Sequence, residues 1–183
     1  MRQPARTRWM MAMVVALGWS TSAAFAAGAA HEHGALKLDV AIEGKLLTIL
    51  LEAPLDNLLG FERAPRTDAE RRAAADVLAR LRSPDKGPPL FAADAAAQCA
   101  VSKTEVQAPV LEPGAGRANQ DEHAELEASY VFTCAKPDEL RTLDVGLFDA
   151  YKRTQRIDVQ VAGPTGQAKM TLTRPARKVR LAR

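Results

Sequence analysis

The stretch of residues 35–54 constrains the fold more than any other part of the chain, because two strand patterns flank a glycine turn there. Apolar side chains occupy every second position of residues 35–43, as in a strand with one buried face. Residues 46–52 are almost continuously apolar, which is typical of a strand buried on both faces. Gly44 separates the two, so the sequence predicts an antiparallel hairpin that ends at Pro54.

Strand alternation recurs in four later segments, namely residues 100–111, 123–135, 156–162 and 167–173. Residues 68–82 instead repeat apolar positions every three to four residues, and Thr67 with Glu70 forms a capping box. This segment is the predicted main helix. Residues 90–97 are compatible with one or two helical turns, and residues 143–148 with a strand or a helix. Together these elements predict an α+β fold: an antiparallel sheet of roughly six strands with one main covering helix.

Residues 1–26 have the layout of a secretory signal peptide. Three arginines precede an apolar run at residues 10–19, and Ala24-Phe25-Ala26 has the small-x-small pattern of a cleavage site. We expect cleavage after Ala26, with Gly28 as the alternative, and an uncleaved anchor as the competing interpretation. The apolar run is too short to span a bilayer. Residues 27–183 then form a single α+β domain without a membrane span.

Loss of that segment changes the net charge. The 25 lysines and arginines of the chain include the three arginines of residues 1–26, so residues 27–183 hold 22 basic and 22 acidic residues. A neutral domain gives no reason to expect nucleic acid binding. The strongly basic residues 174–183 are expected to be a solvated C-terminal tail.

Cys99 and Cys134 are the only cysteines. In an exported protein an isolated pair is expected to form a disulfide. Closing the loop between them would stabilise the fold by on the order of 3–4 kcal/mol. The alternative, a pair of metal thiolates, suits an oxidising compartment less well and lacks the C-x-x-C spacing.

The three histidines lie in two short clusters with carboxylates. His31 and His33 follow the cleavage region, and His123 precedes Glu125 at the start of a predicted strand. Residues i and i+2 of an extended chain point to the same side, so each pair can reach one ion. If these strand starts meet, three nitrogens and one oxygen suit a tetrahedral Zn²⁺ ion. Cu²⁺ or Ni²⁺ also fits imidazole-rich ligation. In a chain that began at Ala29, His31 would be the third residue. The free N-terminal amine, the backbone amides and the His31 imidazole would then chelate Cu²⁺ or Ni²⁺ together.

The alternative interpretation of these clusters is a solvated N-terminus and a polar strand edge. No pattern favours an enzyme, and no catalytic residue is predicted. No serine or cysteine has a plausible histidine base once the cysteines are paired. The chain also has no glycine-rich phosphate loop.

Several motifs together resemble the ZrgA-like family of small exported Gram-negative proteins. They are His31-Glu-His-Gly34, Leu51-Glu-Ala-Pro54, Asn57-Leu-Leu-Gly-Phe-Glu62, Ala64-Pro-Arg-Thr67, Gln98-Cys99, His123-Ala-Glu125, Tyr130-Val-Phe-Thr-Cys134 and residues 148–166 with Gln155-Arg-Ile157. The resemblance covers nearly all of residues 30–173. It implies a periplasmic, zinc-regulated protein that is involved in zinc binding and uptake beside a metal ABC transport system.

The resemblance also implies roles for single residues. It matches His31 and His33 to the family's His-x-His, His123 and Glu125 to its His-x-Glu, and Cys99 and Cys134 to its cysteine pair. Many relatives carry a His/Asp-rich insert before the His-x-Glu motif, whereas residues 112–122 here contain no histidine. This departure argues against a high-capacity zinc store and leaves one compact site.

The sequence therefore predicts a periplasmic zinc-binding accessory protein. It would buffer zinc or pass it to the binding protein of a metal ABC transporter. The rival hypothesis is a non-metal adaptor of the cell envelope that binds another protein through a sheet edge or a loop. If His31, His33 and His123 converge in the fold, the zinc-binding hypothesis is favoured; if they lie apart, the adaptor hypothesis is favoured.

Overall fold

The computed structural model describes residues 33–112 and 124–181. These residues belong to one structural unit, which starts at residue 31. The predicted signal peptide, His31 and His123 lie outside the described residues. Within the described part, no helix is long and apolar enough to cross a membrane.

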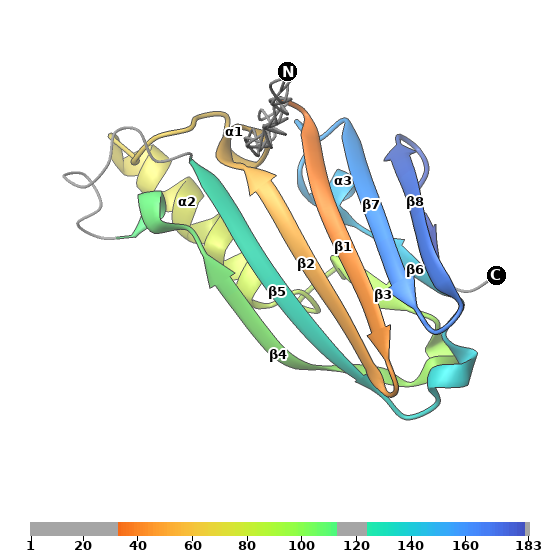
Figure 1. Ribbon diagram of the computed structural model, residues 1–183. Helices are drawn as coiled ribbons and strands as arrows, with labels where there is room; N and C mark the ends of the chain where they lie inside the picture. Colours follow the sequence, from red (N-terminus) through yellow and green to blue (C-terminus); the bar gives the residue numbers. More distant parts are fainter. Residues whose placement is uncertain (1–32, 113–123, 182–183) are drawn as a thin grey trace, which may run out of the picture. The chain divides into compact units, whose positions relative to one another are not determined.

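The predicted hairpin is confirmed. Strands β1 (Ala35–Glu43) and β2 (Leu46–Pro54) pair antiparallel from Lys37 opposite Glu52 to Glu43 opposite Leu46. Gly44 takes φ +56° in the turn, a conformation that glycine adopts without steric cost. The hairpin forms the centre of the main sheet (Figure 1).

The main sheet has six strands in the order β4-β5-β2-β1-β7-β8. The four outer strands are β4 (Cys99–Gln107), β5 (Glu125–Cys134), β7 (Arg156–Gly163) and β8 (Gly166–Thr173). The prediction of an antiparallel sheet is wrong at one junction, because β1 and β7 run parallel. Alternation of apolar residues has the same period in parallel and antiparallel strands, so the pattern does not encode direction.

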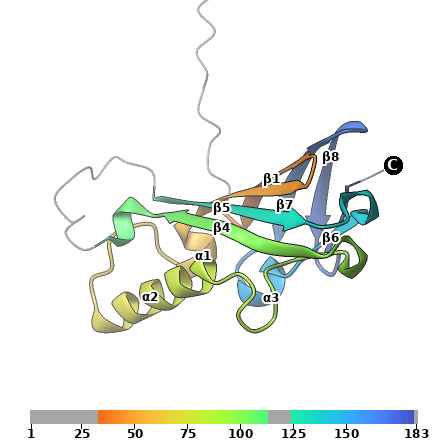
Figure 2. The same cartoon turned by 90° about the horizontal axis from the view of Figure 1, so that it is seen from below.

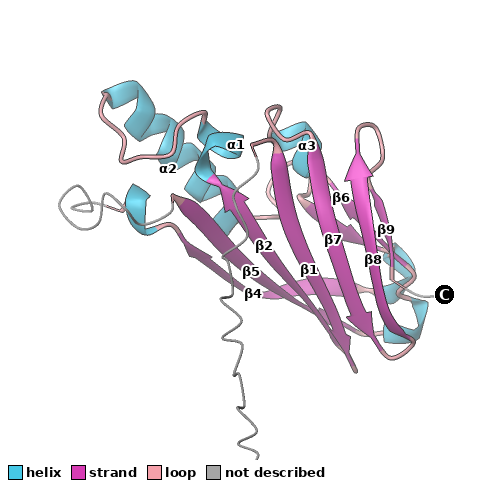
Figure 3. Cartoon of the chain, turned by 45° about the horizontal axis from the view of Figure 1, so that its top comes forward, coloured by secondary structure: helices cyan, strands magenta, loops and turns pink. Residues whose placement is uncertain are grey.

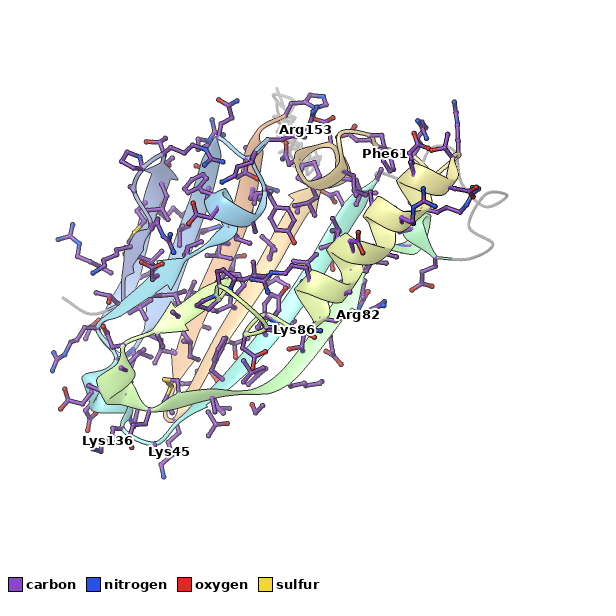
Figure 4. The ribbon with its side chains drawn as sticks, turned by 180° about the vertical axis from the view of Figure 1, so that it is seen from behind. Lys45, Phe61, Arg82, Lys86, Lys136 and Arg153 are labelled. Atoms are coloured by element: carbon purple, nitrogen blue, oxygen red, sulfur yellow. A yellow bond between two sulfur atoms is a disulfide. The ribbon has the colours of Figure 1, made fainter. Side chains whose placement is uncertain are left out.

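One face of this sheet is covered by helices α1 (Leu55–Leu59), α2 (Asp68–Arg82) and α3 (Leu147–Ala150) and by a second sheet (Figures 2 and 4). The second sheet has the order β3-β6-β9, formed by β3 (Phe91–Ala93), β6 (Thr142–Val145) and β9 (Lys178–Arg180). Short 3-10 turns lie at Ala95–Ala97, Pro109–Leu111 and Pro137–Glu139. The opposite face of the main sheet carries no described element (Figure 2).

The main helix is confirmed with its predicted bounds. Thr67 Oγ1 accepts a hydrogen bond from the Glu70 backbone N–H, and the Glu70 carboxylate accepts one from the Thr67 N–H. The predicted helical turns in residues 90–97 are partly wrong, because strand β3 precedes the 3-10 turn there. Residues 143–148 hold both a strand end and the start of α3.

Two observations concern the cysteines and the C-terminal segment. Cys99 and Cys134 lie opposite each other in the β4–β5 ladder and form the predicted disulfide. The expectation of a solvated tail is wrong for residues 174–181, because β9 pairs with β6 and Val179 and Leu181 are buried. Apolar residues that alternate with the cations explain this burial.

Candidate metal site

Three strand ends meet at one end of the main sheet. Lys37, near the start of β1, pairs with Glu52, near the end of β2. Glu125, the first residue of β5, lies opposite Pro54, the last residue of β2. Helix α1 follows β2 directly, so it lies beside the start of β1 at this end (Figure 3).

Asn57 of α1 fixes the entry of the chain into β1. Its Oδ1 accepts a 2.5 Å hydrogen bond from the Gly34 N–H, and its Nδ2 donates a 2.6 Å bond to the Ala35 carbonyl. The side chain is buried, with 1% of the residue exposed, so these bonds satisfy polar groups that water does not reach. They set the position of the residue that precedes Gly34.

Gly34 itself has a structural reason to be glycine. It takes φ +84°, and an added Cβ would lie 3.1 Å from Gln155 Cγ. Its carbonyl accepts hydrogen bonds from the backbone N–H groups of Gln155 and Arg156, at 2.8 and 3.0 Å. The chain before β1 is therefore held between α1 and the start of β7.

His33 and Asp56 form a facing pair at this end. His33 Nδ1 lies 3.3 Å from Asp56 Oδ2. The histidine side chain is 71% exposed and the aspartate side chain 21%. An imidazole nitrogen and a carboxylate oxygen are both ligands that zinc uses in proteins. The pair is thus open to solvent on the histidine side and anchored on the aspartate side.

Arg153 anchors the aspartate. Its Nη2 donates a 3.2 Å hydrogen bond to Asp56 Oδ1, and its Nε donates a 2.9 Å bond to the Asp56 carbonyl. Arg153 lies beside α1 in the view of the covered face (Figure 4). One carboxylate oxygen is held by the guanidinium and the other faces His33. Asp56 and Arg153 line a pocket of ≈ 550 Å³ together with His33 and Gln155.

Of the four predicted ligands, the structure describes only His33 and Glu125. His31 and His123 lie outside the described residues, so the structure does not test their convergence. Ala124 follows His123 in the chain, and its carbonyl accepts a 2.9 Å bond from the N–H of Leu55, the neighbour of Asp56. The described neighbours of both histidine clusters therefore lie at the same end of the sheet.

Glu125 also lies at this end. Leu126 is buried on the covered face, so strand alternation places Glu125 toward the uncovered face. Within residues 33–112 and 124–181, no three His, Cys, Asp or Glu residues gather to hold a metal ion. Zinc sites in proteins use three or four protein ligands, so the His33–Asp56 pair alone does not supply a complete zinc ligand set.

Sequence reasoning missed Asp56 and Arg153. Asp56 is 23 residues from His33 and Arg153 is 97 residues from Asp56, and no short motif connects such separations. The available indication was an acidic residue, Asp56, two positions after the Pro54 that ends the predicted hairpin. Only the sheet order places that residue beside the start of β1.

The described residues form a small α+β domain in which a histidine and a carboxylate face each other at one end of a mixed sheet. The chain belongs to the ZrgA family, since residues 30–181 match the family described as ZrgA family zinc uptake protein. This confirms the resemblance and connects the chain to zinc. The description concerns uptake and names no catalysed reaction. No curated protein matches the chain.

Proposed function

We propose that this protein is a periplasmic zinc-binding accessory protein that binds one Zn²⁺ at the end of the sheet where β1 and β5 begin. The ion is its cargo, which it buffers or passes to the binding protein of a metal ABC transporter. His33 and Asp56 are two of the ligands. Because zinc takes three or four protein ligands, the remaining one or two come from His31, His123 and Glu125.

The observation that carries the proposal is the 3.3 Å approach of His33 Nδ1 to Asp56 Oδ2. A neutral imidazole and an ionised carboxylate at this separation can both turn a lone pair toward one cation. Arg153 holds the other oxygen of Asp56, which orients the carboxylate as a second-layer partner does in metal sites. The family's description as a zinc uptake protein supports zinc as the ion.

The exposure of His33 suits a transfer protein better than a permanent metal site. A ligand with 71% of its side chain exposed is reachable by a competing ligand from a partner. Zinc then passes to the partner through an intermediate in which ligands of both proteins hold the ion, and the sheet need not unfold. A closed site with four buried ligands would hold zinc as a structural ion.

Calorimetric titration of Zn²⁺ into residues 27–183 tests the proposal. We expect one ion per chain, with weaker binding by His33→Ala and by Asp56→Asn. Asp76→Asn on α2 is the matched control, because it removes an exposed carboxylate elsewhere and should bind zinc normally. Absent binding, or equal binding by wild type and both site variants, would exclude this site.

The remaining ligands are tested in the same assay. His31→Ala, His123→Ala and Glu125→Gln identify which of these side chains complete the site, because only the loss of a ligand should weaken binding. Export is tested separately, by cell fractionation and N-terminal sequencing of the mature protein. We expect a periplasmic chain that begins at Ala27, and a chain retained in the cytoplasm would contradict the location.

A further inference from the structure

The two sheets both end at one side of the molecule, next to a pocket. β8 is the last strand of the main sheet and β9 the last strand of the small sheet. The outer edge of each strand therefore pairs with no described strand, and the two lie at the same side (Figure 3). An unpaired edge presents backbone N–H and C=O groups that can bind another extended chain.

The pocket beside these edges has an apolar floor. It measures ≈ 460 Å³ and is lined by residues of β7, β8 and β9 and of the β7–β8 turn. Val161, Met170 and Leu181 supply apolar surface, and Val161 and Leu181 are buried members of the core. A strand added beside β8 would place alternate side chains over this floor.

The charge of the pocket selects the kind of strand. Among the described residues that line it, the charged ones are Lys169 and Arg180, and both are exposed. Neither forms an ion pair with a described residue. Two unneutralised cations beside an open edge favour a partner segment with carboxylates.

The opposite edge of the main sheet, strand β4, differs from β8 in the regularity of its pairing and in the neutralisation of its charges. β4 has a register shift between Val101 and Lys103, and Lys103 pairs with Glu105 at 2.9 Å. A register irregularity of this kind is one way in which proteins protect an edge strand. β8 pairs with β7 without a shift from Arg156 opposite Thr173 to Gly163 opposite Gly166. The structure thus leaves one regular edge and protects the other.

We propose that β8 binds an extended acidic segment of a partner protein as an added strand. Backbone hydrogen bonds to β8 would supply affinity, while Lys169 and Arg180 would select carboxylates and the apolar floor would accept a side chain of the same segment. This surface is separate from the His33–Asp56 pair, and the inference does not depend on zinc binding.

Fluorescence anisotropy with labelled peptides tests the proposal on residues 27–183. The probe is an eight-residue peptide of alternating valine and glutamate, matched in length to β8. Its control carries lysine in place of glutamate. We expect saturable binding of the acidic peptide, about tenfold weaker binding of the basic one, and loss of the difference at high salt.

Variants locate the binding surface. The double variant Lys169→Glu/Arg180→Glu should reverse the preference between the peptides, whereas Lys103→Glu on β4 should leave it unchanged. Lys169→Gln/Arg180→Gln is the milder variant, used if the charge reversal unfolds the protein, and it should abolish the preference. Amide chemical shifts should change along β8. No binding, equal binding of both peptides, or shifts along β4 alone would overturn the proposal.

Discussion

Replacement of Asn57 by alanine is the perturbation that connects the fold to the proposed site most directly. The side chain makes two short hydrogen bonds, to the Gly34 N–H and the Ala35 carbonyl. Each is worth a net 0.5–1.5 kcal/mol or so, and a buried group left without its partner costs roughly 1–3 kcal/mol. Gly34 and Ala35 are half-buried, so water recovers part of that cost. We expect Asn57→Ala to lower the free energy of unfolding by about 2–4 kcal/mol.

Urea unfolding of residues 27–183, followed by tyrosine fluorescence, measures this loss. The two tyrosines, Tyr130 and Tyr151, are both buried, so their emission reports on the core. A domain with a typical stability of about 5–15 kcal/mol stays mostly folded after such a change. The control is Gln160→Ala, which removes an exposed amide on β7 and should change the stability by less than about 0.5 kcal/mol.

The same variant tests the position of His33. Asn57 donates no ligand, but it holds the residue next to His33, so Asn57→Ala should weaken zinc binding under conditions in which the protein remains folded. Unchanged zinc affinity would show that the chain before β1 is positioned by other contacts. A stability change within about 0.5 kcal/mol would refute the assignment of Asn57 as the buried link between α1 and β1.

Three further predictions concern the scaffold. Replacing both members of the Cys99–Cys134 disulfide by serine should cost on the order of 3–4 kcal/mol in urea unfolding, and addition of a reductant should reproduce that loss in the wild type. Burial raises the pKa of Tyr151 to about 12, so the unfolded chain releases this proton first as the pH rises. The contribution of Tyr151 to stability should therefore hold below pH 10 and fall above it by roughly 2–3 kcal/mol toward pH 12, and the Tyr151→Phe variant should lose less stability over this range than the wild type. The hydrogen bond from Arg63 lowers the pKa of Glu70 to about 2, so the stability that Glu70 supplies is present above pH 4.5 and is lost as the pH falls toward 2. Glu70→Gln should then be less stable than wild type at pH 7 and approach it at pH 2, and equal stability of the two at pH 7 would contradict the capping role.

The local elements followed from local patterns. Alternating apolar residues around Gly44 specify the hairpin, and Thr67 with Glu70 specifies the start of α2. The parallel pairing of β1 with β7 did not follow, because residues more than a hundred positions apart must meet and periodicity carries no direction. The small sheet was missed because its strands hold three or four residues, too few for a period to show.

The sequence predicted only the part of the candidate site that local patterns encode. His33 and Glu125 were found from short i, i+2 patterns, and both lie at the end of the sheet where β1 and β5 begin. Asp56 was not found, because its relation to His33 exists only after α1 packs beside β1. Residue type alone cannot single out one carboxylate among the 22 Asp and Glu of the chain. The tertiary contact supplies that information.

The most direct test of the zinc site is an anomalous difference map at the zinc absorption edge, from crystals of residues 27–183 grown with one equivalent of Zn²⁺. The account predicts one strong peak about 2.0–2.2 Å from a ring nitrogen of His33 and from a carboxylate oxygen of Asp56. A zinc peak bound elsewhere, with the His33–Asp56 contact unchanged, would contradict it.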